Sequence, residues 1–386
     1  MVAAAFPFIK VEIDTSALTP VAVRAPGVIA VVGSTDGVGA VGPNQPQRID
    51  TLADAAVAFT ANGTPVVSTP LYRALRLALL QNPRPSKIYG VRADGGDVAS
   101  ALASLDAADD VTFVSLAETP ANAASMPALG ALRAHAENNS AAGQKRIAVM
   151  SIDPSIVKTP TYAADVAALV DPLKSTVSRV AMVAVRGAVD GDGQPADAAT
   201  AAMAAIAGYP PHISMVLKKL LGIRIPLASQ YSSAEIIGLS EAGLLPIIDP
   251  ALIVGESLHF AEGRLFTTDA SQLYIDIVRT LDDIDFRLRA GLIGLVGDAR
   301  ITRPGLIRLK TRIEGILDPL RRNAVIDAFA IDIPLLSILG APETTWTAGD
   351  QALVAEARAN RTVDAFVSIT YGPAIHQLRV TLRPKF

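Results

Sequence analysis

The sequence predicts an α/β fold: one domain with a parallel sheet and flanking helices, plus an α+β C-terminal domain with extended N- and C-terminal arms. Short Val- and Ile-rich runs alternate with helical patterns over residues 29–210, as expected for βαβ units. The alternation is lost near residues 208–231. The chain has 386 residues, and domains of about 100–200 residues imply two or three of them. Hydrophobic residues make up 50% of the chain, enough for a sizeable core.

Residues 1–28 are expected to form an extended arm, because Pro20 and Pro26 exclude a helix. The parallel sheet should follow. We expect its strands at 29–33, 87–92, 111–116, 146–152 and 177–185. We expect its helices at 51–59, from 70 to the Asn82-Pro83 pair, and at 97–105, 123–137, 162–173 and 196–207.

Capping signals define the starts of several helices. Thr51 and Asp54 have capping-box spacing, Thr69 precedes a proline at the first helical position, and Asp97 precedes an apolar segment. Ser232 or Ser233 should cap a further short helix that runs through Ser240. These local signals are independent of the tertiary fold.

The second half of the chain indicates an α+β arrangement from about residue 251. A strand at 244–248 precedes it, and a hairpin is expected within 252–267 around Glu262-Gly263. Long helices are predicted at 270–295 and 304–322, and a strand at 324–333. Residues 363–382 are expected to form extended chain with a hairpin around Tyr371-Gly-Pro373.

Composition excludes several classes of function. Lys plus Arg total 34 and Asp plus Glu 37, so the net charge is −3 and a strongly basic nucleic-acid binder is excluded. The absence of cysteine excludes disulfides, Fe–S clusters and a Cys nucleophile. The four histidines, His135, His212, His259 and His376, are too scattered for a local metal motif, although a site assembled in space stays open. We expect no metal and no cofactor.

The termini and hydropathy point away from membranes. The first ten residues lack a basic region, and Pro7 and Lys10 interrupt their apolar run. No window reaches about 18 uncharged apolar residues, so we expect no membrane insertion. The interpretation is a protein made in a cytoplasm that is kept there or leaves without a signal peptide.

Gly37-Val-Gly-Ala-Val-Gly42 is the one motif that suggests a nucleotide-dependent enzyme on a Rossmann-like domain. That fingerprint requires a helix directly after the glycines, whose N-terminus holds the pyrophosphate. Here Pro43 and Pro46 follow, and the next predicted helix begins near Thr51. A surface loop is the favoured interpretation, and the enzyme is kept as the alternative.

Two charged runs lie on the predicted C-terminal helices. Asp282, Asp283 and Asp285, flanked by Arg279, Arg287 and Arg289, favour a solvated ion-paired face. Residues 300–322 form the only sustained basic stretch. An acidic protein partner, nucleic acid and a plain solvated helix remain open for this stretch.

Several segments in order resemble contractile tail sheath proteins of phage tails, R-type bacteriocins and extracellular contractile injection systems. The opening Ala25-Pro-Gly-Val-Ile-Ala-Val-Val-Gly33 is similar to theirs. The helix at 51–59, Leu71-Tyr-Arg-Ala-Leu-Arg76 and Lys87-Ile-Tyr-Gly-Val-Arg92 follow in the family's order. Residues 239–248, the helix at 270–295 and the strands from Val363 also match. Departures are Pro211-His-Ile-Ser-Met-Val-Leu-Lys218 and Leu258-His-Phe-Ala-Glu-Gly-Arg264.

The resemblance implies a non-enzymatic structural subunit. Such a subunit polymerises helically around an inner tail tube and contracts to drive the tube through a target envelope. The implied domains are an N-terminal arm (1–28), an α/β outer domain (29–250), an α+β inner core domain (251–362) and C-terminal strands with an arm (363–386). Phage, bacteriocin and injection-system origins remain open.

The resemblance also implies partners and contact residues. The partners are other copies of the chain, the inner tube protein, and baseplate and tail terminator proteins, with no nucleic acid. The particle would assemble in the bacterial host cytoplasm and act as a virion tail or extracellular particle. The implied inter-subunit arm residues are Val11, Ile13, Val21, Val23, Val367, Ile369, Leu378 and Val380. Arg308, Lys310 and Arg312 are the expected tube contact, with the acidic face at Asp282 and Asp285 as the second candidate.

Overall fold

A computed structural model describes residues 25, 27–63, 68–255 and 257–376. These fall into two compact units. The larger unit comprises residues 25–284, 325–327 and 370–376, and the smaller unit comprises 285–324 and 328–369. The arm residues Val11, Ile13, Val21, Val23, Leu378 and Val380 lie outside the described residues.

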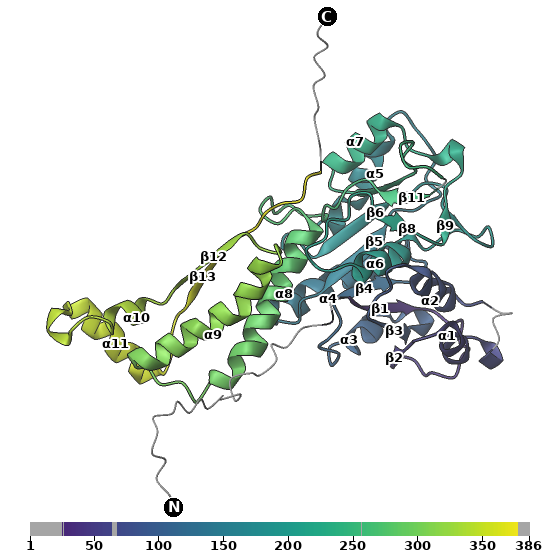
Figure 1. Ribbon diagram of the computed structural model, residues 1–386. Coiled ribbons are helices and arrows are strands. Elements are labelled where there is room, and N and C mark those ends of the chain that lie inside the picture. The colour runs from purple at the N-terminus through teal and green to yellow at the C-terminus, as the bar shows by residue number, and fades with distance from the viewer. Residues whose placement is uncertain (1–24, 26, 64–67, 256, 377–386) are drawn as a thin grey trace, which may run out of the picture. The chain divides into compact units, whose positions relative to one another are not determined.

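A nine-stranded sheet forms the centre of the larger unit (Figure 1). Its central strands, β3, β1, β4, β5, β6 and β10, are parallel, as predicted. The edge strands β2, β11 and β8 are antiparallel to their neighbours. In spatial order the strands are β2 (Gln47–Arg48), β3 (Lys87–Arg92), β1 (Val28–Gly33), β4 (Phe113–Leu116), β5 (Ile147–Ser151), β6 (Val180–Ala184), β10 (Leu245–Ile248), β11 (Leu258–Phe260) and β8 (Lys219–Leu220).

Helices cover both faces of this sheet (Figure 1). In β1, Ile29 and Val31 pack into one core, whereas Val28, Ala30 and Val32 pack into the other, as strand alternation requires. The first core is covered by α1 (Leu52–Phe59), α2 (Pro70–Leu80) and α6 (Ala198–Gly208). The second is covered by α3 (Val98–Ala103), α4 (Met126–Ala141), α5 (Tyr162–Val170) and α7 (Ser233–Glu241). Short 3-10 helices are Ala61–Gly63, Asp94–Gly96, Asp171–Leu173, Leu227–Ser229, Ile293–Leu295 and Glu343–Thr345.

The predicted helix caps are confirmed. Thr51 and Asp54 form a capping box, and the side chains of Thr69 and Asp97 accept hydrogen bonds from the backbone of α2 and α3. Of the two serines considered for α7, Ser232 is the cap, and it forms a capping box with Glu235. Capping bonds connect residues three apart, so a short sequence window specifies them.

The alanine-rich helix α6 packs closely, and all of its residues except Gly208 are buried. A Cβ atom at Gly208 would lie 1.9 Å from the Pro83 carbonyl oxygen. Small side chains therefore permit the backbone contact that joins α6 to the segment after α2.

The hairpin predicted around Glu262-Gly263 is wrong. Residues Leu258–Phe260 form β11, which pairs antiparallel with β10 and β8. The hairpin in this region is therefore made by β10 and β11, and its turn precedes Leu258. After Gly263 the chain instead continues towards a helix, with the Leu265 N–H donating to the Leu273 carbonyl at 2.7 Å. A separate two-stranded sheet joins β7 (Val189–Asp190) to β9 (Ile223–Arg224).

The division between the compact units falls inside α8 (Ile275–Leu292). Its residues through Ile284 belong to the larger unit, and those from Asp285 belong to the smaller. The sequence-based boundary at 250/251 differs from this division, because the pairing of β11 with β10 keeps residues after 250 in the larger unit.

The smaller unit has a small core of its own, formed by Leu306, Ile333, Leu335 and Val354, with Trp346 packed against it. Its elements after α8 are α9 (Arg303–Arg322), β12 (Ala328–Asp332), α10 (Pro334–Ile338), α11 (Ala348–Asn360) and β13 (Phe366–Thr370). β13 pairs with β12. The hairpin predicted around Tyr371 is not found in the described chain, where residues 371–376 form no strand.

Candidate functional site

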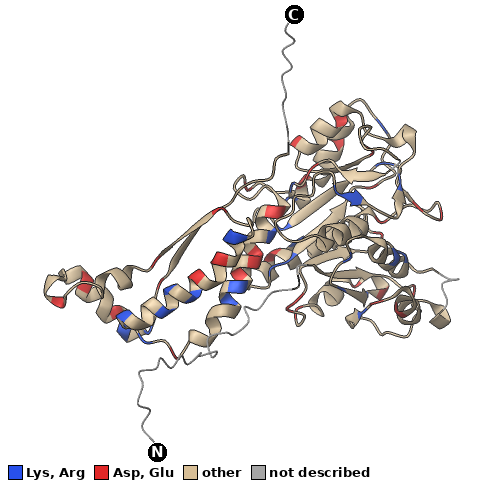
Figure 2. Ribbon diagram, in the orientation of Figure 1, with Lys and Arg blue, Asp and Glu red and all other residues tan. Residues whose placement is uncertain are grey.

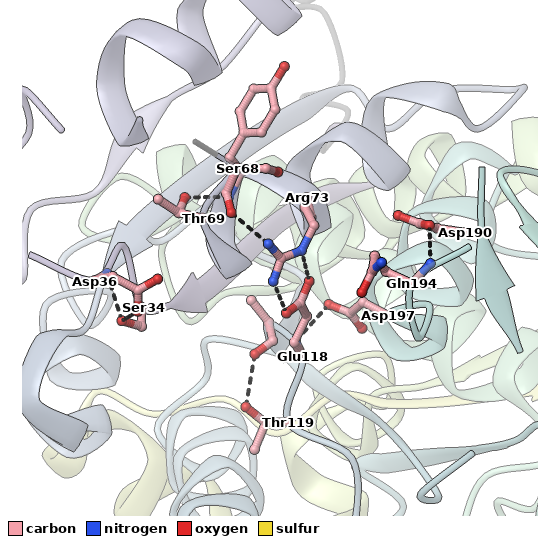
Figure 3. Close-up of polar contacts among 12 residues, drawn as sticks. Ser34, Asp36, Ser68, Thr69, Arg73, Glu118, Thr119, Asp190, Gln194 and Asp197 are labelled. Carbon is pink, nitrogen blue, oxygen red and sulfur yellow. Dashed lines mark hydrogen bonds and ion pairs between the residues drawn. The ribbon is translucent and has the colours of Figure 1, made fainter. Parts of the chain in front are cut away.

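Ligands of open α/β sheets bind outside the carboxyl ends of the parallel strands. The strand order β3-β1-β4-β5 reverses direction at β1, and open α/β sheets bind ligands at such switch points. Polar side chains from the segments that follow β1, β4 and β7, and from α2 and α6, gather in this part of the larger unit (Figure 3).

Arg73 and Glu118 form the centre of this cluster (Figure 3). Arg73 Nε and Nη2 each lie 2.5 Å from a Glu118 carboxylate oxygen, and Nη1 donates to the Ser68 carbonyl at 2.6 Å. The hydrogen bond to Glu118 raises the pKa of Arg73. Each guanidinium nitrogen is therefore engaged within the chain, and the pair has the bidentate geometry of a structural ion pair.

Asp197 is the buried carboxylate beside this pair. It caps α6, accepting from the Thr200 N–H at 3.0 Å and the Thr200 hydroxyl at 2.7 Å. It also accepts from the Glu118 N–H at 3.1 Å. Burial raises the pKa of Asp197. Both carboxylate oxygens of Asp197 therefore accept hydrogen bonds within the chain, and the side chain acts as the N-cap of α6.

A cavity of about 310 Å³ lies next to these residues, lined by Arg73, Glu118, Ser151, Gln194 and Asp197 among others. The polar side chains that line it mainly bond one another and the backbone. Among the described residues no group of three or more His, Asp or Glu is arranged to hold a metal ion. The cluster joins α2, the segment after β4, and the N-terminus of α6.

The glycine loop after β1 has the wrong polarity for a phosphate. Gly39 packs on the C-terminal end of α1, where an added Cβ would lie 2.5 Å from the Ala58 carbonyl oxygen. That same oxygen accepts from the Val41 N–H at 3.2 Å. A helix C-terminus carries partial negative charge, which repels an anion. The loop is followed by β2, and the next helix, α1, begins only after that strand. This confirms the prediction that no helix starts directly after the glycines.

The acidic run on α8 serves partly in packing. Asp282 accepts two bonds from Arg179, at 2.6 and 2.9 Å, and Asp285 pairs with Arg289 at 3.0 Å. The expectation that Arg279 flanks this run on a solvated face is wrong. Arg279 is buried and donates to the carbonyls of Ile206 and Tyr209 at the end of α6, at 3.0 and 2.7 Å. Burial lowers its pKa to about 10.

Basic and acidic residues lie along the long helices of the C-terminal part (Figure 2). The three expected tube-contact residues lie on α9 but differ in their surroundings. Arg308 is exposed. Lys310 is half-buried, 3.9 Å from Glu314 one turn away. Arg312 is also half-buried, and its Nε donates to the Gly291 carbonyl of α8 at 3.1 Å. Arg308 is therefore the clearest candidate for a partner, while Arg312 holds α8 and α9 together.

Val367 and Ile369 lie in β13 and are half-buried. The segment expected to act as an inter-subunit arm is therefore paired within its own chain here, because β13 pairs with β12. The described part of the β12–β13 sheet has two strands, so each strand has an outer edge without an in-chain neighbour among the described residues.

Two buried arginines had no recognisable signal in the sequence. Arg186 lies against the rings of Tyr162 and Tyr231, 4.5 and 4.9 Å from their centroids, and bonds Glu235 at 2.7 Å. Arg146 is fully buried, with Nη1 2.8 Å from His135 Nε2. Glu235 is 49 positions from Arg186 and His135 is 11 positions from Arg146, beyond the reach of a helical or capping pattern, so the fold brings these partners together.

Comparison with solved structures identifies the architecture. The chain aligns with a chain of the anti-feeding prophage (AFP) helical sheath in its contracted state, with 15% identity, a TM-score of 0.63 and 99% coverage of both chains. The fold is that of a contractile sheath protein.

Two further sheath structures share this fold. An extracellular contractile injection system, the PVC sheath complex in its contracted state, matches with 12% identity and a TM-score of 0.68, covering 99% of this chain and 98% of that one. A sheath tail protein from Desulfitobacterium hafniense matches with 14% identity and a TM-score of 0.55, covering 85% and 93%. No family model and no curated protein matches the chain.

The sheath fold accounts for both compact units, since the aligned regions include nearly the whole chain. In the part of the chain that the structure describes, no helix is both long and apolar enough to cross a membrane.

Proposed function

We propose that the chain is the structural subunit of a contractile sheath. It polymerises helically around an inner tail tube and contracts to drive that tube through a target envelope. The observation that carries the proposal is the match of nearly the full chain to two contracted sheath structures. Both compact units take part in that match, so it does not rest on the common α/β domain alone.

The enzyme alternative has less support. The polar cluster at the carboxyl edge is used in helix capping and ion pairing, and the glycine loop lies against a helix C-terminus. We therefore propose a non-enzymatic subunit that needs no cofactor.

Polymerisation is proposed to use strand addition. The outer edges of β12 and β13 offer unpaired backbone groups, which an extended segment of another copy can bind. The donors would be the arms that contain Val11, Ile13, Val21 and Val23 at one end and Leu378 and Val380 at the other. Val367 and Ile369 would then lie in the receiving sheet. A head-to-tail contact of this kind does not close and generates a helix.

The tube contact is proposed to involve α9, with the exposed Arg308 as its main cation. Exposed ion pairs contribute about 0–1 kcal/mol each, which suits a sheath that must release the tube on contraction. Many weak contacts around each ring would hold the extended state. Baseplate and tail terminator proteins are the proposed partners at the two ends, in a particle assembled in the bacterial host cytoplasm.

The test is direct. The purified chain should form tubes that pellet at high speed and are visible by negative-stain microscopy. Deleting residues 1–20 or 377–386 should leave a folded subunit that forms no tubes. Deleting residues 377–386 is more informative than deleting residues 363–386, because the longer deletion also removes β13, which pairs with β12 in the same chain. Small particles from the intact chain, or long tubes from both truncations, would contradict the proposal.

A further inference from the structure

The last described segment, residues 370–376, is attached to the larger unit by side chains. The Tyr371 hydroxyl donates to the Asp276 carboxylate at 2.8 Å. Just before it, the Asp327 N–H donates to the Thr370 carbonyl at 2.9 Å. Residues 371–376 form no strand with any other described residue.

The other end of the segment has a second attachment. His376 Nε2 lies 2.9 Å from the Ser214 hydroxyl oxygen. The His376 ring packs edge-on against Tyr274, with 5.0 Å between ring centroids and an interplanar angle of 80°. The segment between Tyr371 and His376 is exposed. It is therefore fixed at both ends and spans the surface between them.

Asp276 makes the first attachment strong. The residue is buried, at 4% exposure, in the first turn of α8, where the helix dipole favours a negative charge. A buried carboxylate that loses a donor bears a desolvation cost, so the Tyr371 hydroxyl is not easily replaced. Burial and the bond to Asp276 both raise the pKa of Tyr371, which keeps it a hydrogen-bond donor.

The first half of α8 is itself firmly attached to the larger unit. One turn after Asp276, Arg279 donates to carbonyls at the end of α6. Another turn on, Asp282 accepts two bonds from Arg179. Tyr371 is therefore bonded to a helix that is held by charged contacts along its length within this unit.

We propose that Tyr371 and His376 form a clasp that anchors the root of the C-terminal arm to the larger unit. The inference rests on the proposed sheath function, in which a neighbouring copy pulls on residues 377–386. Without the clasp, such a pull would load the end of β13 and open its bonds to β12 one at a time. With the clasp, the pull reaches the first turn of α8 and is shared with the sheet unit.

Spin labelling of the isolated subunit tests the clasp. The chain has no cysteine, so Ala374→Cys, in the exposed part of the segment, gives a single nitroxide site. In otherwise wild-type protein the spectrum should be dominated by an immobilised component. Tyr371→Phe should raise the ratio of mobile to immobile label about tenfold, as expected for loss of a hydrogen bond to a charged group. Adding His376→Ala should raise the ratio further.

Tyr89→Phe is the matched control, because it removes a tyrosine hydroxyl that lies 3.4 Å from Asp110 elsewhere in the same unit. Its label spectrum should equal that of wild type. Circular dichroism establishes that each variant is folded. A mobile label in wild type, or identical spectra in wild type and the double variant, would overturn the clasp.

Assembled tubes test the mechanical role. Tubes of the double variant should be shorter than wild-type tubes after the same shear treatment, while Tyr89→Phe tubes keep wild-type length. Equal lengths would refute the load-bearing role. If the wild-type chain forms no tubes, the sheath proposal fails, and with it the load-bearing role, whereas the spin-label result still decides whether the clasp exists.

Discussion

Acid should destabilise the larger unit through His135. Its Nε2 lies 2.8 Å from Nη1 of Arg146, which can only donate, so neutral His135 accepts at this nitrogen. Protonation would place two cations in contact in a buried site. Burial, and then the Arg146 charge, lower the pKa of His135 from 6.5 to about 4, although Asp106 acts in the opposite direction.

The sign and size of the effect follow from proton linkage. Between pH 6.5 and about 4 the unfolded chain binds a proton at His135 that the folded chain does not. The free energy of unfolding is therefore highest above pH 6.5 and falls as the pH is lowered towards 4. A shift from 6.5 to about 4 corresponds to at most about 3 kcal/mol.

Urea unfolding at low protein concentration, measured from pH 7 to pH 4.5, provides the assay. His135→Gln offers Arg146 a neutral acceptor and removes the titration, so its stability should depend much less on pH. His212→Gln is the matched control, because burial and then the Arg279 charge lower the pKa of that half-buried histidine as well, with Asp283 acting in the opposite direction. If His135→Gln kept the full wild-type pH dependence in this window, the reasoning would be refuted.

Four substitutions and one binding experiment test the packing, partner-contact and enzyme interpretations. Arg312→Ala should lower the free energy of unfolding by about 1–2 kcal/mol through loss of its bond to the Gly291 carbonyl, whereas Arg308→Ala should leave urea unfolding within about 0.5 kcal/mol of wild type. In co-assembly with a tube, Arg308→Glu should reduce the yield of extended particles, and wild-type yields would place the contact elsewhere. Arg186→Met should cost about 3 kcal/mol in the same urea assay, because it removes the cation paired with the mostly buried Glu235 carboxylate, which is left with its capping bond from the Ser232 N–H, and a loss below about 1 kcal/mol would contradict that role. Calorimetry with NAD or ATP should show no micromolar binding, and measurable binding would revive the enzyme alternative.

Much of the architecture follows from the sequence because its signals are local. The bonds that begin α1, α2, α3 and α7 join residues three apart, and alternation of apolar strands with helices implies a parallel sheet covered on both faces. The absence of a helix after the glycine loop could also be read directly, since Pro43 and Pro46 stand where that helix would begin. The order of short apolar segments was enough to suggest the sheath fold.

Tertiary structure alone decided which charged residues face solvent and which strands pair. Arg279 has the spacing of a solvated helix residue, yet it reaches carbonyls more than sixty residues earlier in the chain. β11 pairs with β10 and β8, and β13 with β12, because sheet edges are completed by whichever strand the fold brings alongside. The same holds for the clasp, in which Tyr371 meets Asp276 across 95 positions. Periodicity specifies which face of an element is apolar, but the partner of a buried charge or an edge strand depends on the path of the whole chain.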